Sequence, residues 1–285
     1  MPARILLATD MDRTLLPNGA QPESPGARSL FASVVARPEV TLAYVTGRHR
    51  ALVEEAIAEY RLPEPDYVIG DVGTTLYRID GAGWHEQPDW TLAIGRDWAG
   101  RTTGELAATL AAIAELRLQE AGKQNTWKLS YYTPVLADPT PLLASARTRL
   151  AALGVSANLI WSIDEAAGVG LLDVLPASAS KLHALEFLVR SLGLPYRQAL
   201  FAGDSGNDLE VLAGPIPAVL VANADESVRR QAVELAHAQG NPGSLYLARG
   251  AWAGLNGNYS AGILEGLAHF MPETQAWMMA AERRP

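Results

Sequence analysis

The sequence contains no cysteine, which excludes disulfide bonds, thiol catalysis and cysteine-ligated zinc sites. It also lacks any run of lysine or arginine, and its 31 acidic residues outnumber the 23 basic ones, giving a formal charge of −8. A nucleic-acid partner is therefore not expected, because binding a phosphate backbone requires a basic surface. A hard cation held by oxygen ligands remains compatible with this composition.

Long hydrophobic runs are missing as well. The first apolar stretch, Ile5 to Ala8, is too short for the core of a signal peptide or for a membrane-spanning helix. We therefore expect a cytoplasmic protein that makes no use of a membrane. The 48% hydrophobic and 19% charged content is that of a folded enzyme, and 285 residues suffice for one large or two medium domains.

Short apolar runs that end in polar loops recur along the chain and are typical of buried parallel strands. The predicted strands are 4–9, 40–45, 67–69, 198–202 and 218–221, with helices predicted at 51–60 and 181–192. This alternation predicts an open α/β sheet of the Rossmann-like type, whose ligands bind beyond the carboxyl ends of the strands.

The rhythm changes between residues 84 and 175, where five of the seven tryptophans lie. We predict an inserted α/β domain at 84–175, between the pieces 1–83 and 176–285 of the main domain. Within the insert, the pattern indicates helices at 102–119 and 141–153 and strands at 126–133, 157–162 and 169–175.

Two acidic loops follow predicted strands. Asp10 and Asp12 come directly after the first strand, and Asp204 and Asp208 lie in the sequence Gly-Asp-Ser-Gly-Asn-Asp after a later one. Carboxylates at adjacent strand ends would repel one another by about 4 kcal/mol per pair at 4 Å, so they call for a cation. Because no cysteine or histidine lies beside them, Mg²⁺ is the ion predicted. Any single aspartate could instead serve only in a turn or helix cap.

Other polar groups follow the same logic. Thr46, Gly47 and Arg48 stand after the second strand and offer a hydroxyl, a backbone amide and a cation to a phosphate group. Lys181 opens a predicted helix and could hold a negatively charged intermediate, although a lone lysine is more often a solvated surface residue.

Together these pieces resemble the haloacid dehalogenase (HAD) superfamily, in the order DxDxT, strand-end threonine, lysine and GDxxND. The resemblance implies Asp10 as the nucleophile, Asp12 as the general acid and base, Thr46 as a phosphate ligand and Lys181 as a positioning lysine. It further implies Asp204 and Asp208 as metal ligands together with the first two aspartates, and Asn207 as a substrate contact. Arg13 departs from the motif only at a variable position.

The insert resembles the C2B-type α/β cap of sugar phosphatases, and several stretches are similar to sucrose-phosphate phosphatases. These stretches are 65–74, 128–132, 172–176 and 257–266. Strand alternation places Lys128, Ser130 and Tyr132 on one face, which we expect to turn toward the active site and contact the sugar. Gly47 and Arg48 are expected to contact the substrate as well.

The resemblance implies a Mg²⁺-dependent phosphatase acting on a small-molecule sugar phosphate, with sucrose 6-phosphate as the first candidate. A broad sugar-phosphate or cofactor phosphatase on the same scaffold is an alternative. A third is a sugar-phosphate-binding regulatory domain without turnover, which the presence of Asp10, Asp12 and Lys181 disfavours. The sequence leaves open any partnership with a synthase.

Overall fold

The computed structural model describes residues 4–164 and 167–282, so the first and last three residues of the predicted main domain, and residues 165–166 of the predicted insert, lie outside it. It divides into two compact units, one of Met1–Glu86 with Lys181–Pro285 and one of Gln87–Ser180. The predicted insert, 84–175, begins three residues before the first residue of the second unit and ends five residues before its last residue. The two units are described separately below.

The first unit is built on an eight-stranded sheet with the strand order β12-β11-β10-β1-β2-β3-β4-β5. The six strands from β12 to β3 are parallel, and β4 and β5 add an antiparallel hairpin at one edge. The strands are β1 (Ile5–Thr9), β2 (Val40–Val45), β3 (Tyr67–Gly70), β4 (Thr75–Asp80), β5 (Gly83–Glu86), β10 (Ala199–Gly203), β11 (Ala218–Leu220) and β12 (Leu245–Leu247). All five residues of β1 are buried, as expected for a central strand covered on both faces.

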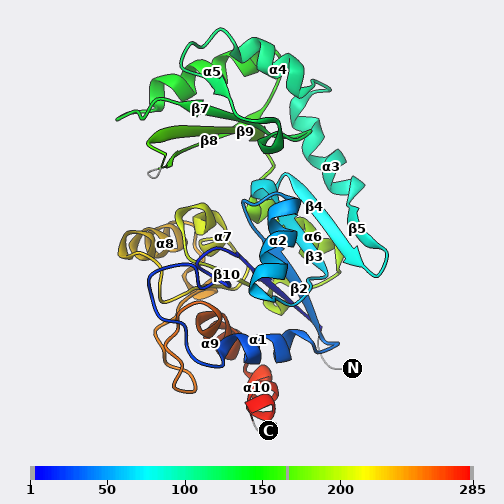
Figure 1. Cartoon of the computed structure of the whole chain (residues 1–285), viewed down its shortest axis with the longest axis vertical. Helices are drawn as coiled ribbons and strands as arrows, with labels where there is room; N and C mark the ends of the chain where they lie inside the picture. Colours follow the sequence, from blue (N-terminus) through cyan, green and yellow to red (C-terminus); the bar gives the residue numbers. More distant parts are fainter. Residues whose placement is uncertain (1–3, 165–166, 283–285) are drawn as a thin grey trace. The chain divides into compact units, whose positions relative to one another are not determined.

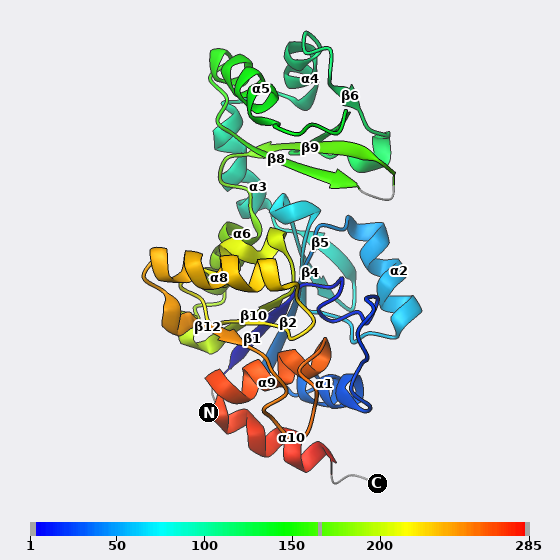
Figure 2. The same ribbon diagram turned by 90° about the vertical axis from the view of Figure 1, so that its left-hand side faces the viewer.

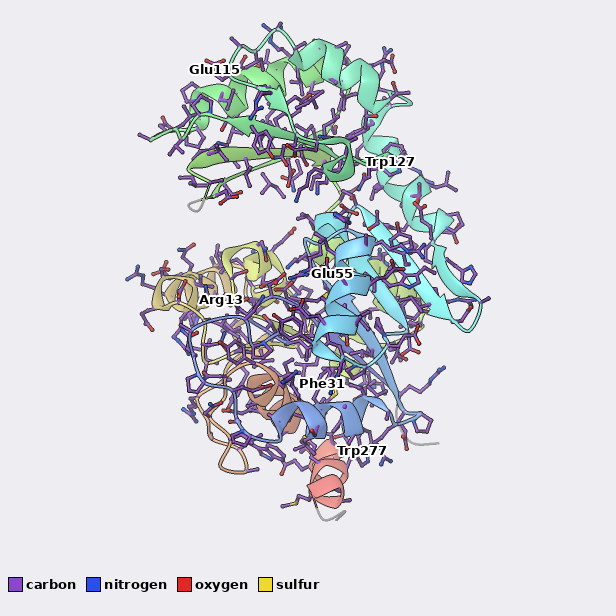
Figure 3. The ribbon with its side chains drawn as sticks, viewed as in Figure 1. Arg13, Phe31, Glu55, Glu115, Trp127 and Trp277 are labelled. Carbon is purple, nitrogen blue, oxygen red and sulfur yellow. The ribbon has the colours of Figure 1, made fainter. Side chains whose placement is uncertain are left out.

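Helices cover both faces of this sheet (Figures 1 and 2). One face carries α1 (Ala27–Val35), α2 (Arg50–Tyr60), α9 (Ser260–Phe270) and α10 (Gln275–Glu282), and the other carries α6 (Lys181–Ser191), α7 (Leu209–Leu212) and α8 (Glu226–Ala238). Phe31 points from α1 into a core that also takes Leu264 and Leu267 of α9 (Figure 3). The arrangement is the predicted Rossmann-like α/β fold.

The second unit has a four-stranded antiparallel sheet in the order β6-β7-β9-β8, with helices packed on one face. Its elements are α3 (Pro88–Gly95), α4 (Thr103–Leu110), β6 (Arg117–Leu118), β7 (Leu129–Thr133), α5 (Thr140–Ala152), β8 (Ala157–Asp164) and β9 (Val169–Pro176). Leu106 of α4 and Leu150 of α5 are buried against Leu129 and Tyr131 of β7. The unit therefore has a hydrophobic core of its own.

Two predictions for this second unit were wrong in extent. The helix predicted at 102–119 ends at Leu110, although the next residues favour helix, because the chain turns so that Arg117 and Leu118 can pair with β7. The strand predicted at 126–133 begins only at Leu129, since Asn125 and Lys128 close a tight turn just before it.

The remaining differences concern elements that were not predicted. The hairpin β4–β5 was missed, although the turn between Asp80 and Gly83 is a hairpin signal.

Among the described residues, no helix is both long enough and apolar enough to cross a membrane.

Candidate active site

The strand order places the candidate site at a reversal in the sheet. From β1 the chain moves outward through β2 and β3 on one side, and it later returns to build β10, β11 and β12 on the other. Asp10, Thr46 and Asp204 each stand directly after one of the strands β1, β2 and β10. Such a switch point leaves a crevice at the carboxyl ends of parallel strands, where open α/β folds bind ligands.

Three buried carboxylates meet there. Asp10, Asp204 and Asp208 each offer one oxygen, and these three oxygens lie within 4.8 Å of one another. Lys181, itself buried at the first position of α6, donates from Nζ to Asp10 Oδ1 at 3.0 Å and to Asp208 Oδ1 at 2.8 Å. Its third bond, of 2.9 Å, goes to Asn207 Oδ1. The structure thus brings together five of the predicted residues, Asp10, Lys181, Asp204, Asn207 and Asp208.

Burial of these charges shifts their protonation. Burial raises the pKa of Asp10 to about 8, with Asp208 and Asp204 adding to the rise and Lys181 opposing it. Burial also raises the pKa of Asp204 to about 6, again with Asp208 adding to it and Arg13 opposing it. Burial would lower the pKa of Lys181, but the Asp10 and Asp208 carboxylates outweigh it and raise that pKa overall. Lys181 is therefore charged, whereas Asp10 and Asp204 lose their protons at higher pH than ordinary aspartates do.

A short turn fixes the orientation of Asp208. In the sequence Gly206–Asp208, which forms one turn of 3₁₀ helix, Asp208 Oδ2 accepts from the backbone amides of Asp204 at 3.1 Å and Ser205 at 3.2 Å. Because Lys181 takes the other oxygen, both oxygens of this fully buried carboxylate are satisfied.

Asp12 takes a different position from the other three predicted acids. Its carboxylate is not part of the acidic group and accepts two hydrogen bonds from Arg48, Nε to Oδ2 at 2.8 Å and Nη2 to Oδ1 at 2.7 Å. Asn18 donates a third, at 2.8 Å. Burial raises the pKa of Asp12, but the bonds from Arg48 and Asn18 outweigh it and lower that pKa overall. The Asp12 side chain therefore lies outside the acidic group in this structure, and its predicted role as a metal ligand stays a prediction.

The loop after β2 is held by hydrogen bonds from a strained turn at Asp71 and Val72. Thr46 is buried, and its Oγ1 accepts from the Arg48 amide at 3.2 Å. The amides of Asp71 and Val72 donate to the carbonyls of Arg48 and Thr46, at 3.0 and 3.2 Å. Asp71 and Val72 have φ values of 50° and 60°, a left-handed conformation that costs a branched residue such as valine energy. The strained turn therefore fixes the Thr46–Arg48 loop.

A pocket of about 270 Å³ opens at this site. Seven of the predicted residues line it: Asp10, Asp12, Thr46, Gly47, Arg48, Asp204 and Asn207. Arg13, Ser205 and Leu52 line it too and were not predicted as site residues. Arg13 and Ser205 lie inside the two acidic motifs, so motif position was the signal that could have identified them.

In the second unit, Ser130 and Tyr132 lie on the sheet face opposite the helices, since Leu129 and Tyr131 fill the core. Lys128, in the turn before β7, is 93% buried, so it is not the solvated lysine that a surface position would predict. Ser130 donates from Oγ to Asp173 Oδ1, which gives that strand-interior carboxylate a partner. That this face contacts the sugar stays a prediction.

The acidic group fits a hard divalent cation. Mg²⁺ favours a few carboxylates combined with water and substrate phosphate oxygens. Within this group of three carboxylates, Asp204 Oδ2 is buried, accepts no hydrogen bond among the described residues and lies 3.3 Å from Nε of Arg13. Asp10, Asp204 and Asp208 are the residues that would hold the ion, and the charge of Lys181 alone does not balance them.

Comparison with known proteins agrees with this site. Residues 3–271 match the family described as sucrose-6F-phosphate phosphohydrolase. A protein of Nitrosococcus oceani named as a HAD-like hydrolase is 53% identical over 98% of this chain and 75% of its own length. The mannosylfructose-phosphate phosphatase of Agrobacterium fabrum is 28% identical over 93% of this chain and 96% of its own. The sucrose-phosphatase 1 of Nicotiana tabacum is 28% identical over 94% of this chain, which spans 59% of that protein's length.

Among solved structures, the sucrose-phosphatase from Synechocystis in complex with sucrose and phosphate is similar over 94% of this chain and 98% of its own. The TM-score is 0.70 and the sequence identity 25%. The chain therefore belongs to the sucrose-6F-phosphate phosphohydrolase family within the HAD hydrolases, and it is a phosphoric monoester hydrolase.

Proposed function

We propose that this sugar-phosphate phosphatase hydrolyses a disaccharide phosphate, sucrose 6-phosphate before others, through a phosphorylated Asp10. The observation that carries the proposal is the position of Lys181, whose ammonium joins Asp10 to Asp208 beside an open pocket. The family description and the relative crystallised with sucrose and phosphate support the choice of sugar.

In the first step, an oxygen of Asp10 attacks phosphorus and the bond from phosphorus to the sugar oxygen breaks. Because Lys181 occupies Oδ1, we assign the attack to Oδ2. Lys181, the Thr46 hydroxyl and backbone amides of the loops offset charge on the phosphoryl oxygens. When bound, Mg²⁺ would supply further positive charge to the same oxygens and screen the crowded carboxylates.

The leaving sugar oxygen needs a proton, and the second step needs one removed from water. Asp12 is the group we assign to both, giving its proton to the sugar and then taking one from the water that attacks the phosphorus. This second attack breaks the bond between phosphorus and Asp10 and releases inorganic phosphate. The ion pair with Arg48 favours ionised Asp12, which is the form that the second step uses. The first step therefore requires Arg48 to release Asp12 and Asp12 to take up a proton from solvent before it protonates the sugar oxygen.

The test is phosphate release from a panel of sugar phosphates, with Mg²⁺ and with a chelator. Sucrose 6-phosphate should be preferred over hexose phosphates, and chelation should abolish turnover. Asp10→Asn should lower the rate by at least about 10³-fold and remove acid-trapped labelled phosphate from the protein. Asp89→Asn, at an exposed aspartate, is the matched control and should change neither. Labelled phosphate that persists on the Asp10→Asn variant would contradict the proposal.

Mannosylfructose phosphate is the second candidate substrate, because the Agrobacterium relative is named for it and aligns over nearly its whole length. It belongs in the same panel. A flat profile over disaccharide and hexose phosphates would instead favour the broad-specificity alternative.

The sheet face of the second unit is proposed to read the sugar through Lys128, Ser130 and Tyr132. Lys128→Met should then lower kcat/KM for the disaccharide phosphate while leaving hydrolysis of a small aryl phosphate nearly unchanged. Lys123→Met, at an exposed lysine of the same loop, is the control. Equal losses on both substrates would remove Lys128 from substrate recognition.

A further inference from the structure

Arg13 lies in the loop after β1 (Figure 3), and its guanidinium reaches Asp204 of the acidic group. Its Nε lies 3.3 Å from Asp204 Oδ2, in an ion pair. That oxygen is buried and accepts no hydrogen bond among the described residues, whereas Oδ1 of the same carboxylate accepts from the Thr14 hydroxyl at 3.2 Å. Arg13 therefore stands in front of the Asp204 oxygen that is otherwise open to a cation.

The backbone of Arg13 is held from both sides. Its amide donates to Asn18 Oδ1 at 2.8 Å, and its carbonyl accepts from Asn223 Nδ2 at 2.6 Å. Asn223 is buried and also accepts from the Tyr259 amide at 2.8 Å, which ties the loop to the start of α9. Arg13 has φ of 55°, a left-handed conformation that these contacts stabilise. Its place near Asp204 is thus built into the fold.

The Arg13 side chain also contacts a second carboxylate in the same position. Nη2 lies 3.4 Å from Oδ1 of Asp225, whose side chain is 64% exposed, and the Arg13 side chain itself is 38% exposed. A guanidinium that leaves Asp204 can therefore keep Asp225 as a partner. A divalent cation bound by Asp204 Oδ2 would meet the positive charge of Arg13 at close range, and the two would repel.

We propose that Arg13 is a built-in competitor of the divalent cation at Asp204, so that binding of the ion requires the guanidinium to withdraw toward Asp225. Arg13 neutralises Asp204 when the ion is absent and weakens the affinity for the ion. The inference rests on the proposed function only in taking the acidic group as the cation site. It makes Arg13 a positioning residue that acts through Asp204.

Calorimetric titration of the full chain with Mg²⁺, without substrate, tests this directly. Arg13→Met should bind Mg²⁺ more tightly than the unaltered protein, with Kd lower by about tenfold, a usual size for coupling between neighbouring charges. Arg78→Met, which removes an exposed arginine paired with Asp80, is the matched control and should leave Kd unchanged. An Arg13→Met protein with equal or weaker Mg²⁺ affinity would overturn the inference.

A second variant guards against misfolding of the first. Asp225→Asn removes the alternative partner, so Arg13 should hold Asp204 more firmly and Kd for Mg²⁺ should rise. In the Arg13→Met background the same change should have little effect, because the competitor is gone. Equal effects of Asp225→Asn in both backgrounds would overturn the inference too. The trapped phosphate on Asp10 is measured separately, so a failure here leaves the proposed function standing.

Discussion

At the scale of single residues, the site balances three buried carboxylates against one buried ammonium. Burial raises the pKa of Asp10 to about 8 and that of Asp204 to about 6, so in the ion-free protein Asp204 keeps its proton up to about pH 6 and Asp10 up to about pH 8. Asp208 is secured differently, by two backbone amides and by Lys181. The acidic group is therefore costly to keep ionised without a cation, which is what a metal-dependent site requires.

This arrangement predicts how the stability of the ion-free protein depends on pH. Between the unfolded pKa of 3.8 and the folded values, the folded state binds more protons than the unfolded state at Asp10 and Asp204. Stability must therefore fall as pH rises through that window. Lys181 has a raised pKa, so its contribution is fully present below 10.5 and does not change there.

Thermal unfolding in a chelator should show the fall, with a loss on the order of 5 kcal/mol between pH 5 and pH 8, because each protonated group contributes about 1.4 kcal/mol per pH unit below its folded pKa. Saturating Mg²⁺ should reduce it, since a bound cation stabilises the ionised carboxylates. Asp204→Asn should remove the part that belongs to Asp204, whereas Asp89→Asn should leave the slope unchanged. Stability that rises from pH 5 to pH 8 in the chelator would contradict the assignment.

At the scale of elements, α9 organises the loop that precedes it. Glu265 is buried on this helix, and its carboxylate accepts from the Tyr246 hydroxyl at 2.8 Å and from the amides of Arg249 and Gly250 at 3.1 and 2.8 Å. The same helix begins next to Tyr259, whose amide donates to Asn223, the residue that also holds the Arg13 loop. One buried carboxylate thus connects β12, the following loop and α9.

Glu265→Leu should destabilise the protein by about 2–4 kcal/mol, because two backbone amides and a tyrosine hydroxyl, all in partly buried hydrogen bonds, would lose their acceptor. Glu234→Leu, at an exposed position of α8, is the matched control and should cost less than about 0.5 kcal/mol. Urea unfolding followed by tryptophan fluorescence measures both. Similar midpoints for the two variants would show that the Glu265 network contributes little.

Elements also explain how far the sequence predicts the site. Asp10, Thr46 and Asp204 could be predicted to meet because the carboxyl ends of neighbouring parallel strands share one edge of a sheet. The partner of Asp12 could not, since Asp12 lies beyond the strand end and periodicity no longer gives its direction. The ion pair of Arg13 with Asp204 joins loops 191 positions apart, and only the folded chain shows it.

The same reasoning applies to the strands and helices. The buried parallel strands were predicted within one or two residues, because their apolar runs are continuous. The segment after Leu110 was not, because pairing of Arg117 and Leu118 with β7 overrides a helical composition. Elements whose form depends on a distant partner are those that local sequence predicts worst.

At the scale of the whole molecule, the two units differ in how the chain builds them. The first is assembled from two separate stretches, whereas the second is one continuous piece, Gln87–Ser180. This piece contains every strand of its own sheet and a core that takes residues from α4, α5, β7, β8 and β9. Trp98 and Trp127 pack edge to face inside it, with ring centroids 5.3 Å apart.

Residues 87–180 produced alone should therefore fold. Ninety-four residues with one core are within the size range of independent domains, although small enough that stability would be modest. Dispersed methyl and amide NMR signals and a cooperative urea transition would demonstrate folding. Trp98→Ala, which deletes a fully buried ring, should cost the fragment about 3–5 kcal/mol and abolish the transition, whereas Leu92→Ala, at an exposed position, should preserve it. A fragment that stays unfolded would mean that the first unit supplies stability that the core of the second lacks.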